Sequence, residues 1–143
     1  MIREIIKNDI SGTAILTQTS EKVEKGENIS DLIRDLIDTA KSHTDPECAG
    51  LAAIQIGVPK RVCVMVDGDK YIPIINPFII QRSKGTHMST EVCLSVEGER
   101  TIKRHNEVIA MIDVGGKRKK RVFGGIHSVI LQHEMDHMNG LLV

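Results

Sequence analysis

The clearest hydrophobic pattern in the first half of the chain is helical. Apolar residues recur three and four positions apart, with charged residues on the opposite face: Ile29, Leu32, Ile33, Leu36, Ile37 and Ala40. This pattern predicts an amphipathic helix with Asn28 or Ser30 as its N-cap and an end before Pro46. Residues 1–27 have no clean period and predict an irregular arm with at most one short strand.

The middle of the chain has the shorter apolar segments that are typical of strands. The valine-rich segment 61–66 predicts a buried strand that ends at Asp67-Gly68-Asp69. A second β segment over 71–80 contains Pro73 and Pro77, which restrict it to an edge strand or a broken strand.

Further along, segments 108–114 and 117–123 flank Gly115-Gly116 and predict a β-hairpin. Its second strand carries the basic run 117–121, which could indicate nucleic-acid binding. The run is short and has no interleaved aromatics, and the 19 basic residues of the chain are matched by 19 acidic ones. We therefore expect no direct nucleic-acid specificity.

The last periodic segment predicts a helix that ends at Gly140. Three apolar residues precede two histidines on one of its faces: Ile126, Val129, Ile130, His133 and His137. The histidines are therefore expected to point toward a core.

The segment 133–137 reads His-Glu-Met-Asp-His, in which both imidazoles can reach one metal ion from a helix. Glu134 lies beside that face and can take a proton from water that the metal activates. The alternative is a pair of structural histidines, but two imidazoles next to a carboxylate are costly to bury without a partner. A third protein ligand is needed, and the candidates are Glu91, Cys93, Asp113 and Asp136.

Length and composition fit a single domain over residues 1–143. The chain has neither an apolar run of bilayer length nor the h-region of a signal peptide, so we expect a cytoplasmic protein without membrane contact. The three cysteines fit free thiols or a metal ligand better than disulfides. Gln55, the polar residue in an apolar run, is either a buried structural residue or an oxyanion donor.

Three separated segments together resemble peptide deformylase. The family carries Gly-x-Gly-Leu-Ala-Ala-x-Gln, Glu-Gly-Cys-Leu-Ser and Gln-His-Glu-x-Asp-His-Leu-x-Gly in this order, and residues 48–55, 91–95 and 132–140 match them. Ile75-Asn76-Pro77 also matches the Asn-Pro strand of the family.

The resemblance implies an α+β fold with small antiparallel sheets around a central metal-binding helix. It implies removal of the formyl group from the N-terminal formyl-methionine of nascent polypeptides, with release of formate. It further implies ferrous iron as the metal, with zinc, nickel or cobalt able to occupy the site. The partners would be formyl-methionyl peptides and, weakly, the ribosome exit region, and we expect a monomer.

The resemblance also implies roles for individual residues. The metal ligands would be Cys93, His133 and His137, with Glu134 as general base and then general acid. Gln55 and the backbone N–H of Leu94 would hold the developing oxyanion. The substrate would contact a further group of residues, in which Glu91 pairs with Arg100 at the edge of the methionine pocket: Gly50, Glu91, Val92, Arg100, Val129 and Ile130.

The chain departs from the family pattern at several positions. Val92 and Cys48 replace glycines, and Glu97 replaces a usual proline. A β-branched residue at 92 is tolerated only if the backbone there is extended. The chain ends at Val143, where bacterial relatives usually continue into an extension that contributes to ribosome docking, so weak ribosome binding is expected. Two alternatives remain at this point: a His-Glu-x-x-His endopeptidase, and a metal-binding relative without activity.

Overall fold

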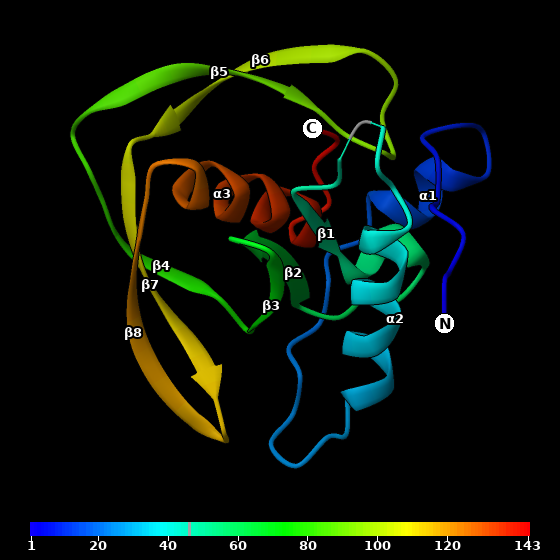
Figure 1. Cartoon of the computed structure of the whole chain (residues 1–143), viewed down its shortest axis with the longest axis horizontal. Helices are drawn as coiled ribbons and strands as arrows, with labels where there is room; N and C mark the ends of the chain where they lie inside the picture. The colour runs from blue at the N-terminus through cyan, green and yellow to red at the C-terminus, as the bar shows by residue number, and fades with distance from the viewer. Residues whose placement is uncertain (46) are drawn as a thin grey trace.

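The computed structural model describes residues 1–45 and 47–143, and its centre is one helix surrounded by three antiparallel sheets (Figure 1). That helix, α3 (Ile126–Met138), contacts strands of all three sheets. The predicted α+β fold with small antiparallel sheets around the histidine-bearing helix is therefore confirmed. The helix is followed by Gly140 at φ 77°, a left-handed conformation that suits glycine, as predicted.

The first sheet has the order β1 (Gly50–Ala52), β2 (Val62–Asp67), β3 (Lys70–Ile75). The valine-rich strand β2 lies in the middle and is buried, as its composition predicts. Pro73 lies in the edge strand β3, where a missing N–H is tolerated. A short 3₁₀ helix, η1 (Ala53–Ile56), continues directly from β1.

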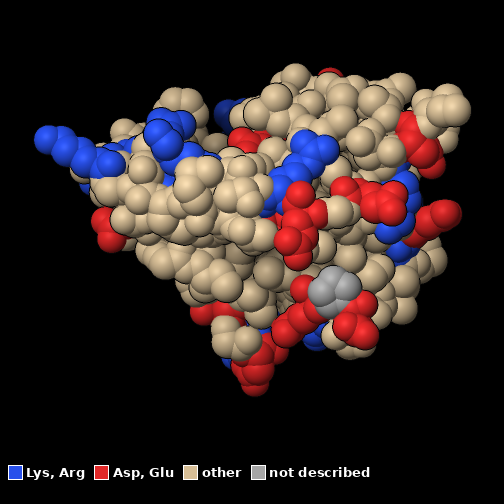
Figure 2. All heavy atoms as spheres, turned by 90° about the horizontal axis from the view of Figure 1, so that it is seen from above, with Lys and Arg blue, Asp and Glu red and all other residues tan. Residues whose placement is uncertain are grey.

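The second sheet has the order β4 (Phe78–Arg82), β7 (Glu107–Val114), β8 (Lys117–Gly124). The predicted hairpin between β7 and β8 is confirmed. The predicted β segment 71–80 is broken between β3 and β4. The inner face of this sheet contributes Val108, Ala110, Ile112 and Phe123 to the core around α3. The basic run lies on the edge strand β8. On the face seen in Figure 2, Lys/Arg and Asp/Glu side chains occur side by side.

The third sheet is a two-stranded ribbon of β5 (Thr86–Val92) and β6 (Glu99–His105), which curves over α3 (Figure 1). The hydrophobic pattern does not predict it, because most of its side chains are exposed. The ribbon positions one of the candidate metal ligands, because β5 ends just before Cys93.

Two helices flank this arrangement. The arm contains a short helix, α1 (Gly12–Leu16), which was not predicted, and Glu21 forms an isolated β-bridge with Lys60. Helix α2 (Ser30–Lys41) is confirmed, but Ile29 occupies the N-cap position and the predicted caps flank it. The Asn28 Oδ1 atom accepts a hydrogen bond from the Ser30 N–H at 3.0 Å. The helix ends at Lys41, before Pro46 as predicted, and Pro46 itself lies outside the described residues. Within the described ranges, we find no helix that is long and apolar enough to cross a bilayer.

Candidate metal centre and active site

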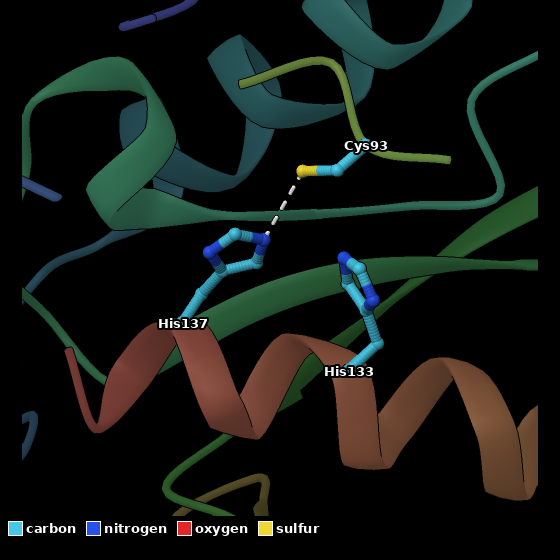
Figure 3. A group of neighbouring side chains, drawn as sticks. All are labelled: Cys93, His133 and His137. Carbon is cyan, nitrogen blue, oxygen red and sulfur yellow. Dashed lines mark hydrogen bonds between the residues drawn. The ribbon is translucent and has the colours of Figure 1, made fainter. Parts of the chain in front are cut away.

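Two side chains of α3 and one from the segment after β5 converge above the helix (Figure 3). His133 and His137 lie one turn apart on the helix, and Cys93 follows the end of β5. The Cys93 Sγ atom lies 3.3 Å from His137 Nε2, and one potential ligand atom from each residue lies within 4.8 Å of the others. Of the four candidates for the third ligand, the structure thus brings Cys93 to the histidines.

The other three candidates have different partners. The Asp136 carboxylate accepts a hydrogen bond from Arg104 at 2.6 Å, and Asp113 pairs with Arg118 at 2.9 Å. Glu91 binds the far side of a histidine, since its Oε1 atom lies 2.7 Å from His133 Nδ1. A carboxylate in that position sets the ring orientation of a metal-binding histidine without itself reaching the ion.

These residues fit a divalent metal ion. One thiolate and two imidazoles form a common donor set, and an ion with bonds of about 2.0 to 2.3 Å can contact all three after small side-chain adjustments. Burial lowers the pKa of His133, but the Cys93 thiol and the Glu91 carboxylate outweigh it and raise the pKa to about 10. The site therefore favours a positive charge at this point. Burial and the neighbouring His133 lower the pKa of His137 to about 3, which keeps it in the neutral, metal-binding form.

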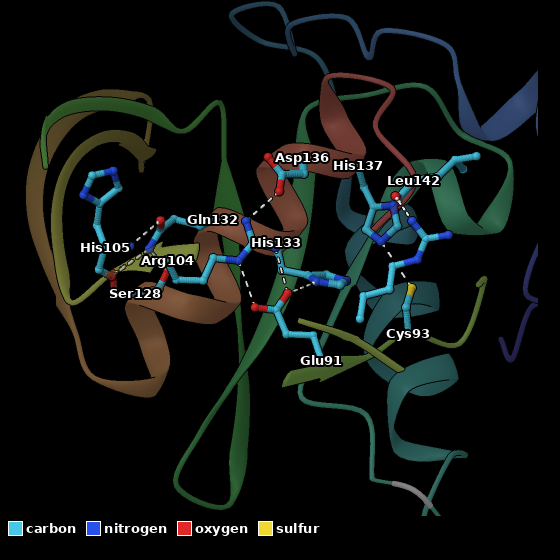
Figure 4. A network of polar contacts seen from close by, with 11 residues as sticks. Glu91, Cys93, Arg104, His105, Ser128, Gln132, His133, Asp136, His137 and Leu142 are labelled. Atoms are coloured by element: carbon cyan, nitrogen blue, oxygen red, sulfur yellow. Dashed lines mark hydrogen bonds and ion pairs between the residues drawn. The ribbon is translucent and has the colours of Figure 1, made fainter. Parts of the chain in front are cut away.

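Arg104 connects the ribbon to the helix (Figure 4). Arg104 is only 4% exposed, and its guanidinium contacts both Glu91 oxygens at 2.7 and 2.8 Å, as well as Asp136. Burial raises the pKa of Glu91, but hydrogen bonds from Arg104 and His133 bring it to about 2. Glu91 is therefore a carboxylate that holds His133 in place.

The predicted pair of Glu91 and Arg100 is wrong. Arg100 lies opposite Glu91 in the strand register, but its guanidinium donates to the carbonyl of Leu142 at 3.0 Å. Arg104 takes the place that was expected for Arg100, because it can reach Glu91 and Asp136 together. The helix residue Gln132 also holds the end of β6, because its side chain accepts a hydrogen bond from the His105 N–H and donates one to the His105 carbonyl.

Glu134 is buried next to the two histidines, with 3% of its surface exposed. Burial raises its pKa to about 7, although His133 acts in the opposite direction. Its Oε1 atom has no hydrogen-bond partner among the residues that the structure covers. A buried carboxyl group with a pKa near neutrality and a free oxygen can both accept and release a proton.

Gln55 lies beside Cys93, and Leu94 follows Cys93 in the chain. The Gln55 Oε1 atom accepts from the Ala52 N–H at 3.0 Å, and this contact directs Nε2 toward Ser95 Oγ at 3.0 Å and Cys93 Sγ at 3.6 Å. The amide donor therefore lies beside the metal ligand. Of the two interpretations of Gln55, the structure is consistent with both, since the residue is buried and also borders the site.

A cavity of about 490 Å³ opens beside these groups between β1, β5 and α3. All but one of the residues predicted to contact substrate line it: Gly50, Glu91, Val92, Val129 and Ile130. The predicted catalytic residues Gln55, Leu94 and Glu134 and the predicted metal ligands Cys93 and His133 line it as well. Arg100 is not among the lining residues. Val92 is 58% exposed and lies in β5 opposite Glu99, so the backbone is extended and accepts a β-branched residue.

The sequence model of polypeptide deformylases matches residues 2–143. The chain belongs to the polypeptide deformylase family. It is 38% identical to a peptide deformylase of Clostridium beijerinckii over the full length of both chains, and 40% identical to one of Dictyoglomus thermophilum over the whole chain and 91% of the relative. The crystal structure of a peptide deformylase from Thermotoga maritima superposes with a TM-score of 0.88 at 28% identity, covering 99% of this chain and 95% of that one.

Membership of the peptide deformylase family gives the site its chemistry. The protein is a metal-dependent hydrolase that acts on formyl-methionyl nascent peptides and removes the formyl group. Membership of this family sets the endopeptidase aside. The β5 residues His87, Ser89 and Thr90, which line the cavity, were not predicted, because the mixed strand β5 has no hydrophobic pattern that would have placed them there. Arg104 of β6, which does not line the cavity but holds Glu91, was not predicted either.

Proposed function

We propose that the formylated end of a nascent peptide binds in the cavity between β1 and β5, with its methionine side chain against α3. Val129 and Ile130 from the helix and Val92 from β5 give this region apolar walls, which suit a thioether side chain. Among the described residues, strand β1 pairs with β2 on one side only, so its other edge can pair with an extended peptide at Gly50.

We infer that Cys93, His133 and His137 hold ferrous iron. The soft thiolate and the imidazoles suit iron, and zinc, nickel or cobalt fit the same donors. When bound, the ion acts as a Lewis acid toward water and the formyl group.

The side chains around the ion would carry out the proton transfers. Glu134 would accept a proton from the attacking water and return it to the amine nitrogen as the C–N bond breaks, so that formate and a free amino group result. Gln55 Nε2 and the Leu94 N–H would donate hydrogen bonds to the formyl oxygen as it becomes negative. Glu91 would contribute to the site by holding His133. A monomeric state, weak ribosome binding and a place in the cytoplasm, where formylated chains are made, stay predictions.

The observation that carries the proposal is the convergence of the Cys93 sulfur with the two histidine nitrogens beside a buried Glu134. The experiment is formate release from formyl-Met-Ala-Ser by anaerobically prepared, iron-loaded protein. We expect one formate for each new amino group, and no cleavage of acetyl-Met-Ala-Ser or of an internal peptide bond. Internal cleavage without formate would contradict the proposal.

Gly50→Ala is expected to lower kcat by about 10- to 100-fold, because it displaces the proton-transfer group. A Cβ atom at this position would lie 2.7 Å from Glu134 Oε2 and 2.8 Å from Ile130 Cγ2, and both side chains are buried. The matched control is Gly124→Ala, whose Cβ atom would meet only Glu107 Oε2 at 3.8 Å. Equal formate release by both variants would show that the close approach at Gly50 is unimportant.

A further inference from the structure

The two proposed oxyanion donors belong to segments that no strand pairing joins. Gln55 lies in η1, which follows strand β1 of the first sheet, whereas Leu94 lies two residues after the end of β5 in the third sheet. A direct contact between the segments is the hydrogen bond from Gln55 Nε2 to Ser95 Oγ. Because two donors must be fixed relative to each other to stabilise one oxygen atom, a further link between the segments has functional value.

The N-terminal arm supplies that link. The Ile6 N–H donates to the Gln55 carbonyl at 2.7 Å, and the Asn8 N–H donates to the Ser95 carbonyl at 2.7 Å. Between them, the Lys7 ammonium group donates to the Leu94 carbonyl at 2.6 Å. Three consecutive arm residues thus contact both donor-bearing segments, from outside the cavity that the substrate is proposed to enter.

We propose that Lys7 is a positioning residue for deformylation, which acts by fixing the Leu94 peptide. The inference rests on the proposed role of the Leu94 N–H. The Leu94 carbonyl and N–H flank the same Cα atom, so a charged donor on the carbonyl restricts rotation of the backbone that aims the N–H. Lys7 does not touch the substrate cavity, and its side chain is exposed at the surface.

Because the Lys7 side chain is exposed, its positioning role can be tested separately from a contribution to folding. Exposed charged contacts contribute little to stability, so removal of the ammonium group should leave the fold intact. Its effect should instead appear in the step where negative charge develops on the formyl oxygen. The loss is expected in kcat, with KM unchanged, because the donor is needed more in the transition state than in the bound substrate.

The experiment compares Lys7→Met, Lys7→Arg and Lys25→Met, each loaded with iron. Methionine keeps most of the apolar stem of Lys7 and removes its charge, and arginine keeps a charged donor. Lys25 is an exposed lysine of the same arm, in the turn before Gly26, and serves as the matched control. We expect kcat of Lys7→Met to fall by about three- to tenfold, at unchanged KM, metal content and melting temperature, with Lys7→Arg restoring most of it.

Each other outcome overturns the inference. An unchanged kcat in Lys7→Met, an effect on KM alone, or an equal loss in Lys25→Met would show that Lys7 does not position the Leu94 peptide. A fall in melting temperature together with kcat, without rescue by arginine, would assign Lys7 a purely structural role. Failure of the proposed function is distinguishable, because the unmodified protein would then release no formate.

Discussion

Replacing Glu134 by alanine is expected to lower kcat for formate release by about 10²- to 10⁴-fold while the protein keeps its metal. The carboxylate is not one of the three converging ligands, so its loss leaves the donor set intact. Glu134 is, however, buried beside these ligands, and burial raises its pKa to about 7. A carboxyl group with this pKa can take up and release the proton that the reaction transfers. The measurement is steady-state formate release together with metal content in the same preparation.

The control for Glu134→Ala is Glu107→Ala, which removes an exposed carboxylate at the start of β7. This variant should match the unmodified protein in rate and metal content. Glu134→Gln separates charge from shape, because it fills the same space but cannot accept a proton. We expect it to be nearly as slow as alanine. Substantial activity in either Glu134 variant, with metal bound, would refute the role of Glu134 as the base.

The sequence predicted the parts of the fold in which burial imposes a period. The helices α2 and α3, the strand β2 and the β7–β8 hairpin all pack an apolar face or an apolar strand against the core, and each appears where expected. The β5–β6 ribbon was not predicted, since one face is exposed and the covered face carries polar residues such as Ser89, Glu91 and Arg104, so no alternating hydrophobic pattern appears. The short helix α1 was also not predicted, because five residues are too few for a helical period to emerge.

The site shows the same division between local and long-range information. The spacing of His133 and His137 on one helix is local, and the structure places both histidines in the group of side chains that could hold a metal ion. Cys93 was one of four candidates on residues alone, and the resemblance selected it. The partner of Glu91 could not be predicted from the register. Arg100 is its direct neighbour across the strands, but the ribbon curves over α3 and brings Arg104 within reach of both Glu91 and Asp136 (Figures 1 and 4).

Cys93→Ala is expected to lose the metal itself, with a more than 100-fold weaker affinity, and with it all measurable deformylation. The two remaining imidazoles come from one helix and leave half of a tetrahedral shell without a protein donor. The measurement is the metal-to-protein ratio after anaerobic loading and gel filtration, which should fall from about one to near zero.

The matched control for this change is Cys48→Ala, since Cys48 lines the same cavity and is also a free cysteine. Burial raises the pKa of the Cys48 thiol to about 12, so it remains protonated and is a poor ligand. Its sulfur donates to the Gly50 carbonyl at 3.1 Å and does not belong to the group around His133 and His137. Cys48→Ala should therefore keep its metal. A fully loaded Cys93→Ala protein would mean that the thiolate is not a ligand, and loss of metal in both variants would point to damage of the cavity and not to ligation.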